Sequence, residues 1–155
     1  MKTLSFLKSA TVIAVSLISF SVFADVDTFA DDNAVTLSGH DAVAYFTENQ
    51  AVEGSAAFTS VYDGAIFYFS SAKNRDTFNA NPAKYAPQYG GFCAYGTALG
   101  KKLPVDGKAF EVVDGKLYVN KNLDVYETWV EDKEENITEA NSQWKVIKSV
   151  AAQDL

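Results

Sequence analysis

Three side chains of this sequence could bind a metal ion or attack an electrophile. They are the only cysteine, Cys93, the only histidine, His40, and the adjacent Asp41. A thiolate and an imidazole together favour copper(I) or zinc, so one hypothesis is an open metal site built on these residues. A second hypothesis is a nucleophilic Cys93–His40 pair with Asp41 as the neighbouring carboxylate. One cysteine and one histidine cannot form a closed zinc site, and their spacing favours neither hypothesis.

Cys93 lies within residues 89–96, a segment rich in glycine and aromatic residues. Such a composition is typical of a tight loop, because glycine takes positive φ and allows close approach of other groups. The thiol is therefore either a small buried hydrophobe or a reactive or metal-binding group. Lys101 and Lys102 follow the loop and would favour a thiolate if they lay close to it. We expect both lysines to be solvated instead.

The first 24 residues are typical of a secretory signal peptide. Lys2 and Lys8 precede an apolar run over residues 10–20, and a small residue, Ala24, occupies the expected cleavage position. The run is too short for a stable transmembrane helix. We therefore expect cleavage near Ala24 and a periplasmic or secreted protein, bacterial in origin, whose mature chain does not insert into a membrane.

Charge and cysteine content narrow the function classes. The chain has a formal net charge of −7, and the expected signal peptide holds two lysines and no acid. Such an acidic mature chain argues against nucleic acid as a partner. Exported proteins usually pair their cysteines, but a single cysteine has no partner in its own chain. Cys93 must therefore be buried, joined to another molecule, bound to a metal or used as a reactive thiol.

The first half of the mature chain predicts a loose lead, a helix cap and a hairpin. Residues 25–38 are an acidic N-terminal lead that ends in a short edge strand, and Asp41 is placed to cap a helix over residues 42–46. Asp63-Gly64 suits a type I′ turn. The turn predicts three pairs, with apolar residues on both faces and hence cover on both sides. The pairs are Tyr62 with Ala65, Ser60 with Phe67 and Phe58 with Phe69.

The second half predicts a helix, another hairpin and two more helices. Ser70 or Ser71 can cap a helix over residues 72–80, and Pro82 can begin a further turn. The turn at Asp114-Gly115 predicts a half-buried hairpin with an apolar inner face and a polar outer face. The inner face holds Phe110, Val112, Leu117 and Val119, and the outer face holds Glu111, Lys116, Tyr118 and Asn120.

A helical periodicity follows the second hairpin. It predicts two helices with a break near residues 134–136, and it places Trp129 and Trp144 in the core. We therefore expect an α+β fold, a single small domain with two antiparallel β-hairpins flanked by helices.

Several segments resemble the YHS domain, and more narrowly exported bacterial YHS-domain proteins. They are YFSSAKNR at residues 68–75, NPAKY at residues 81–85 and QYGGFCAYG at residues 88–96. HDAVAYF at residues 40–46 is similar to the Tyr-Asp-Pro-Val-Ala-Tyr-Phe segment of that group. The resemblance implies a YHS-type domain over residues 39–150. In this chain Phe69 stands where the family's name-giving motif has histidine.

The resemblance also implies a function, because YHS domains are similar to modules that bind or sense metals and occur in copper-transporting ATPases. We expect an exported metal-binding or metal-handling module, with copper or zinc held by Cys93, His40 and Asp41. Two alternatives stay open. One is a thiol redox protein that works through Cys93, and the other is a non-catalytic interaction or ligand-binding module with a structural cysteine. Under the metal-binding and ligand-binding hypotheses, the partner is a metal ion or a small ligand. We expect a non-enzymatic role.

Overall fold

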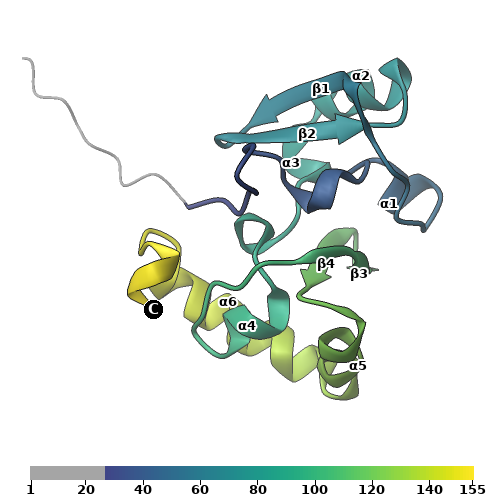
Figure 1. Ribbon diagram of the computed structural model, residues 1–155. Coiled ribbons are helices and arrows are strands. Elements are labelled where there is room, and N and C mark those ends of the chain that lie inside the picture. The colour runs from purple at the N-terminus through teal and green to yellow at the C-terminus, as the bar shows by residue number, and fades with distance from the viewer. Residues whose placement is uncertain (1–26) are drawn as a thin grey trace, which may run out of the picture.

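The computed structural model describes residues 27–155, so the expected signal peptide lies outside the described residues. The chain forms an N-terminal half, η1 to α3, packed on a C-terminal half, α4 to α6 (Figure 1). The α+β class with two antiparallel hairpins is confirmed. The elements are η1 (Leu37–Gly39), α1 (Ala44–Thr47), β1 (Ser55–Tyr62), β2 (Ala65–Phe69), α2 (Ala72–Ala80), α3 (Pro82–Tyr85), η2 (Tyr89–Gly91), α4 (Ala94–Ala98), β3 (Asp106–Val113), β4 (Lys116–Asn120), α5 (Leu123–Glu131), α6 (Lys133–Ile147) and η3 (Ala152–Asp154).

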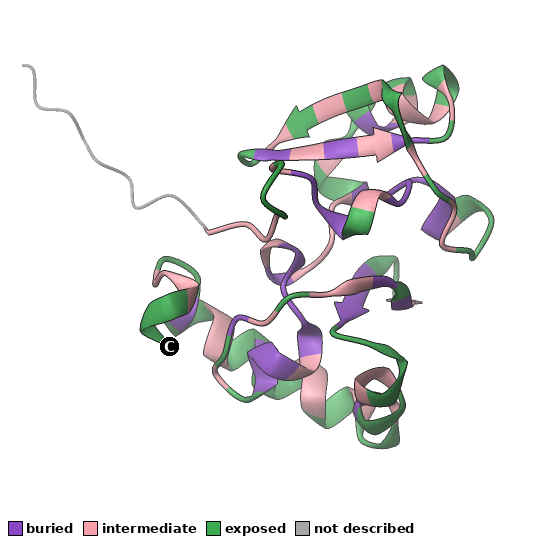
Figure 2. Ribbon diagram, in the orientation of Figure 1, coloured by how far each residue is buried: buried purple, intermediate pink, exposed green. Residues whose placement is uncertain are grey.

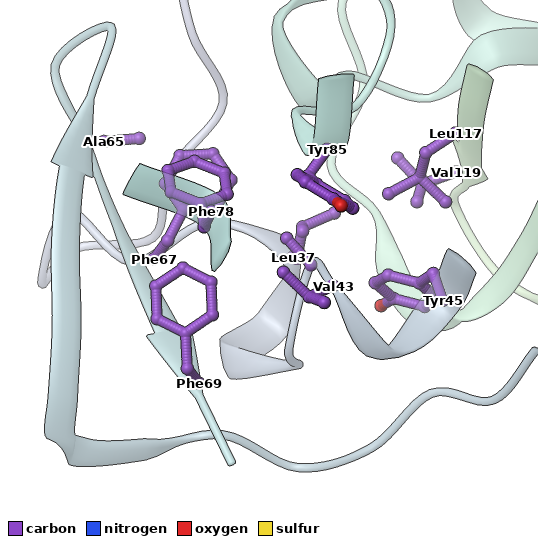
Figure 3. Packing of buried hydrophobic residues seen from close by; sticks show 11 residues of the cluster. Leu37, Val43, Tyr45, Ala65, Phe67, Phe69, Phe78, Tyr85, Leu117 and Val119 are labelled. Carbon is purple, nitrogen blue, oxygen red and sulfur yellow. The ribbon is translucent and has the colours of Figure 1, made fainter. Parts of the chain in front are cut away.

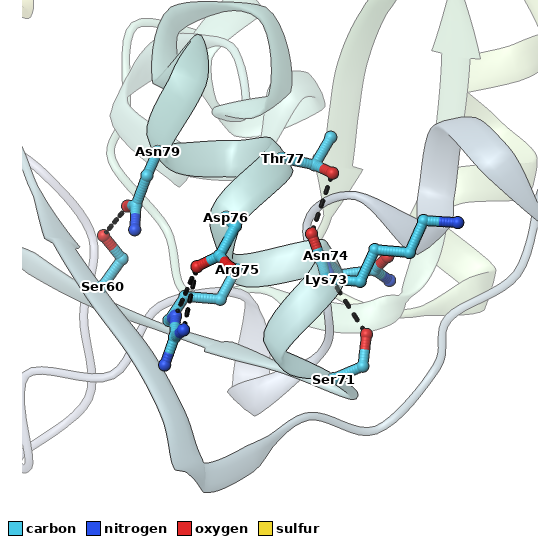
Figure 4. A network of polar contacts seen from close by, with 8 residues as sticks. All are labelled: Ser60, Ser71, Lys73, Asn74, Arg75, Asp76, Thr77 and Asn79. Atoms are coloured by element: carbon cyan, nitrogen blue, oxygen red, sulfur yellow. Dashed lines mark hydrogen bonds and ion pairs between the residues drawn. The ribbon is translucent and has the colours of Figure 1, made fainter.

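Helix α2 begins and ends at the residues that the sequence predicts. The Ser71 side chain accepts a hydrogen bond from the backbone N–H of Asn74 at 3.2 Å, which caps the first turn. Polar pairs cover its outer surface, among them an Arg75–Asp76 ion pair of 2.8 Å (Figure 4). Phe78 faces inward and is fully buried. The helix therefore covers one face of the first hairpin.

Both hairpin turns have the expected geometry. Asp63 and Gly64 have φ of 47° and 77°, and Asp114 and Gly115 have φ of 50° and 72°. Two consecutive positive φ values define the type I′ turn that Asp-Gly favours. The sequence of each turn is therefore sufficient to predict it.

The register of the first hairpin is confirmed only near its turn. Tyr62 pairs with Ala65 and Ser60 pairs with Phe67, as predicted. Phe69 pairs with Ser55, and the predicted pair with Phe58 is wrong. The register shifts between Ser55 and Thr59, which is an irregularity of the β-bulge kind. In a bulge, one strand contains more residues than the strand it pairs with, so the pairs beyond the bulge differ from those that simple alternation predicts.

Two clusters of buried side chains form the core. The first core cluster spans both halves and is built around the Phe78 ring, whose centre lies 4.7 Å from that of Phe67 and 5.1 Å from that of Phe69, with tilted ring planes (Figure 3). The second core cluster is formed by the C-terminal half together with Tyr89 of η2. The first comprises Leu37, Ala42, Val43, Tyr45, Ala65, Phe67, Phe69, Phe78, Tyr85, Leu117 and Val119; the second comprises Tyr89, Ala94, Ala98, Tyr118, Trp129 and Ala140.

Strand β4 lies between these clusters and is buried over most of its length (Figure 2). Leu117 and Val119 belong to the first core cluster, whereas Tyr118 belongs to the second. The predicted polar outer face of this hairpin is therefore wrong. Tyr118 is 4% exposed and Asn120 is fully buried, because helices pack where solvent was expected.

The first hairpin shows the opposite difference from its prediction. No residue of β1 is buried, and Val61 is 71% exposed. In β2, buried residues alternate with half-buried ones. This alternation is typical of a sheet with one face on the core, so the expectation of cover on both sides is wrong.

The beginning of the described chain is bound to its end. The backbone N–H of Asp27 donates to the carbonyl of Lys148 at 2.9 Å, and that of Phe29 donates to the carbonyl of Gly90 at 2.8 Å. Val35 forms a parallel bridge to Ile66. The lead that was expected to be loose is therefore attached to the fold from residue 27 onward.

Lys102 holds the same junction together, and the expectation that it is solvated is wrong. Its side chain is fully buried, and its ammonium group lies 3.1 Å from the Asp27 carboxylate. It also donates to the carbonyl oxygens of Lys148 and Val150. All three N–H groups of the ammonium thus have acceptors. The lysine is paired with a carboxylate rather than with the Cys93 thiol.

The two predicted C-terminal helices are present. The Asn122 side chain caps α5 through the N–H of Val125 at 2.9 Å. The break falls at Asp132, slightly before the predicted position. Trp129 is fully buried, as predicted. Over residues 27–155, no helix combines the length and apolar character needed to cross a membrane.

Candidate functional site

Cys93 is a buried thiol at the start of helix α4. Its side chain is fully buried, and its sulfur accepts a hydrogen bond from the N–H of Gly96 at 3.3 Å. Burial raises the pKa of the thiol above its ordinary value, although backbone N–H groups near the sulfur oppose that effect. The group is therefore a protonated thiol near neutral pH, and neither its protonation state nor its access suits a nucleophile.

Asn120, at the end of β4, fixes the cysteine loop. Its side-chain oxygen accepts a hydrogen bond from the N–H of Tyr95 at 3.1 Å and lies 3.6 Å from the Cys93 sulfur. The Tyr95 bond requires an acceptor, so it determines which way the amide points. Sequence reasoning missed Asn120 because it placed this residue on a solvent-exposed face. A buried polar residue bonded to a loop is a sign of a structural role.

His40 is also buried, but its surroundings differ. Its Nδ1 lies 3.0 Å from the carbonyl oxygen of Leu37, so Nδ1 carries the hydrogen and Nε2 the lone pair in the neutral ring. Nε2 is buried and has no hydrogen-bond partner among the described residues. Strand β3 passes so close that a Cβ added to Gly107 would lie 2.5 Å from Nδ1 and would also collide with the Leu37 carbonyl oxygen. Only glycine fits at this crossing.

Asp41 is a structural carboxylate. One oxygen accepts from the N–H groups of Val43 at 2.9 Å and Ala44 at 3.3 Å, at the start of α1. Helix α1 covers Ala44–Thr47 rather than residues 42–46, and Val43 rather than Asp41 occupies its N-cap position, so the predicted helix starts two residues too early. The other oxygen accepts from the N–H and hydroxyl of Ser70 at 2.8 and 2.7 Å and from the amide of Asn74 at 2.7 Å. The side chain thus joins α1 to the end of β2 and to α2.

These three residues do not fit a metal ion as the structure arranges them. The Asp41 oxygens are occupied by hydrogen bonds, and the Cys93 sulfur is buried and hydrogen-bonded. None of the hydrogen bonds found within residues 27–155 joins Cys93 to His40. In the same part of the chain, no group of three or more His, Cys, Asp or Glu side chains could hold a metal ion. That they bind a metal stays a prediction.

A cleft of about 230 Å³ lies where the two halves meet. Its lining comes from the β1–β2 hairpin, from α3 and the segment that follows it, from helix α6 and from Thr28 near the start of the described chain. Three of its side chains are aromatic and one is a carboxylate. The residues that line it are Thr28, Tyr62, Asp63, Phe67, Ala83, Ala86, Pro87, Gln88, Gly90 and Trp144.

The cleft has one charged group, the exposed carboxylate of Asp63 at the hairpin turn. Partial burial raises the pKa of the neighbouring Tyr62 hydroxyl, and the charge and hydrogen bond of Asp63 add to that effect. Sequence reasoning missed the cleft, because its lining comes from four separate segments. Trp144 was expected only in core packing, but it is half-buried and reaches the cleft.

Comparison with known proteins gives one match. Residues 43–89 match the family model described as the YHS domain. No curated protein and no solved structure was found to match the chain. The matched region runs from the start of α1 to the start of η2. It therefore includes most of the cleft lining, whereas His40, Asp41 and Cys93 lie outside it.

Proposed function

We propose that this protein is an exported, non-catalytic ligand-binding module. Residues 43–89 match the YHS domain, a type of domain associated with metals. The observation that carries the proposal is the cleft between the two halves. A concave site with apolar walls and a few polar groups is the usual form of a small-molecule site. In this proposal Cys93 is structural, and its role is to hold the start of α4 against β4.

NMR spectroscopy of the mature protein tests the proposal directly. The probes are choline, benzyl alcohol and benzoate, each titrated separately. A probe that enters the cleft should shift the indole N–H signal of Trp144 and the amide signal of Gly90. The indole signal of Trp129, which is fully buried elsewhere, is the internal control. If no probe shifts the Trp144 signal, the proposed function is wrong.

The thiol redox alternative requires an accessible, acidic thiol. Cys93 is fully buried with a raised pKa, so we expect it to react with a thiol reagent only after the protein is denatured. Because the chain has one cysteine, a single labelling rate reports on this site alone. Rapid labelling of the native protein, or a disulfide dimer on air oxidation, would favour the redox alternative over our proposal.

Metal handling, by copper or zinc, is the second candidate function. It is favoured by the family association and by His40, whose Nδ1 bonds a carbonyl while Nε2 keeps a free lone pair. Metal-bound histidines usually have this arrangement. Cys93 is the only soft donor of the mature chain, so tight copper(I) binding by a monomer would require its loop to open.

An anaerobic copper(I) titration against a competing chelator tests this candidate. Metal handling predicts about one equivalent for the wild type, loss of binding in Cys93→Ser and weaker binding in His40→Ala. Equal binding by the wild type and Cys93→Ser would exclude a copper site at the cysteine. That outcome would leave the ligand-binding proposal unaffected, since the cleft contains neither residue.

A further inference from the structure

We infer that the cleft selects an organic cation, an amine or quaternary ammonium group on a small apolar body. This inference rests on the proposed function and specifies its ligand. The cleft combines aromatic walls with a single negative charge at its edge. Sites for organic cations have these two properties, because ring faces and carboxylates both attract positive charge.

The charge of Asp63, in the lining of the cleft, determines that a cationic ligand is preferred. Asp63 is the only ionisable acid or base among the ten lining residues apart from the Tyr62 hydroxyl, and none of them is Lys, Arg or His. An anionic ligand would therefore meet a carboxylate without a basic group to bind it. The whole chain has a formal net charge of −7, which attracts cations at longer range.

The aromatic side chains supply ring faces that can bind a quaternary ammonium group, which has no N–H group to donate in a hydrogen bond. Tyr62, Phe67 and Trp144 reach the cleft from β1, β2 and α6. Phe67 and Tyr62 are held by contacts with the ring of Phe78, at centroid distances of 4.7 and 6.0 Å. The walls from the N-terminal half are therefore preformed, which lowers the cost of ordering them around a ligand.

The structure itself already places one cation against Trp144. The ammonium of Lys102 lies 5.3 Å from the centre of the Trp144 ring and 5.2 Å from that of Phe92. Lys102 does not line the cleft, and its charge is balanced by Asp27 at 3.1 Å. The charge of Lys102 is therefore already balanced, and Asp63 is the charged residue that a ligand in the cleft would contact.

Two probes of nearly identical shape test the charge directly. Choline carries a trimethylammonium group, and 3,3-dimethyl-1-butanol carries an uncharged tert-butyl group in the same place. In NMR titrations that follow the Trp144 indole, we expect choline to bind about tenfold more tightly than the alcohol, because only choline gains the electrostatic attraction. Added salt should weaken the binding of choline and leave that of the alcohol unchanged.

The chain offers a matched pair of variants. Asp63→Asn removes the charge at the cleft, and Asp114→Asn makes the same change in the other Asp-Gly turn, which does not line it. Asparagine suits both turns, so both variants should fold. We expect a roughly three- to tenfold loss of choline affinity in Asp63→Asn and no change in Asp114→Asn.

The outcomes separate the inference from the proposed function. If the alcohol binds in the cleft as tightly as choline, or if Asp63→Asn binds choline as well as the wild type, the inference is wrong and the ligand-binding function remains. If neither probe shifts the Trp144 signal, the inference is also wrong; the three-probe titration then decides whether the cleft binds any other ligand.

Discussion

The two hairpins have the same turn and the same strand lengths, yet they occupy opposite environments. Each joins an eight-residue strand to a five-residue strand through Asp-Gly. Four of the five residues of β4 are buried, whereas no residue of β1 is. The comparison shows that turn chemistry sets the register nearest the turn but does not determine which hairpin becomes central.

The difference arises from what packs on each hairpin. One face of β4 contacts the first core cluster and the other contacts the second. The β1–β2 hairpin has α2 on one face and solvent on the other (Figure 2). It is also held at its end by the Asp41 carboxylate, which bonds Ser70 and Asn74. The four predictions below test this contrast, from the largest effect to the smallest.

Leu117→Ala should have the largest effect. Leu117 is fully buried in the first core cluster, so its truncation should reduce the free energy of unfolding by about 2–5 kcal/mol. Chemical denaturation monitored by tryptophan fluorescence would measure the change. A loss below about 1 kcal/mol would show that β4 is less tightly packed than the structure indicates.

Asp41→Ala should destabilise the N-terminal half more than the removal of one small side chain would suggest. The substitution leaves the donors of Ser70, Asn74 and the first turn of α1 without their acceptor. We expect a loss of about 2–3 kcal/mol in the free energy of unfolding. Asp76→Ala is the control, because Asp76 is 65% exposed and forms its ion pair with the neighbouring Arg75. Equal effects of the two variants would exclude a special role for Asp41.

Glu111→Ala should have a smaller effect, although Glu111 lies on the central hairpin. Its carboxylate pairs with Lys133 at 2.6 Å, but both side chains remain partly exposed. Partly exposed ion pairs stabilise proteins by about 1 kcal/mol or less. A double-mutant cycle with Lys133→Ala would isolate the pair, and a coupling energy well above that value would indicate a desolvated bridge.

Val61→Thr should have the smallest effect. Val61 is 71% exposed on β1, and threonine keeps the β-branched shape that strands favour. The free energy of unfolding should therefore change by less than about 0.5 kcal/mol. A larger loss in the same denaturation experiment would mean that the open face of the first hairpin is covered by another molecule or another copy.

The sequence predicted the local features well because each depends on neighbouring residues. The cap at Ser71, the bounds of α2 and the two Asp-Gly turns follow from short-range chemistry. The bulge between Ser55 and Thr59 could not be predicted from alternation alone. The burial of Tyr118 and Asn120 could not be predicted either, since it depends on helices that return to β4 from later in the chain.

The candidate site was predicted less well than the fold. Cys93, His40 and Asp41 were selected because their side chains can do chemistry, and the structure gives each a buried position with different neighbours. The cleft escaped prediction because its members have ordinary residue types and meet only in the folded chain. Lys102 was assigned to solvent, since no local pattern indicates that Asp27 lies beside it.

Noncovalent bonds hold the beginning and the end of the described fold next to each other. Lys102 and the Asp27–Lys148 hydrogen bond hold the two ends of the described fold together without a covalent link. A peptide linker from the C-terminal segment to Asp27 would therefore connect two parts of the fold that are already bonded to each other, which keeps the entropic cost of closure low. The exposed residues 47–50 offer a place for new ends. The molecule is thus suited to circular permutation, in which its order along the chain changes and its architecture stays the same.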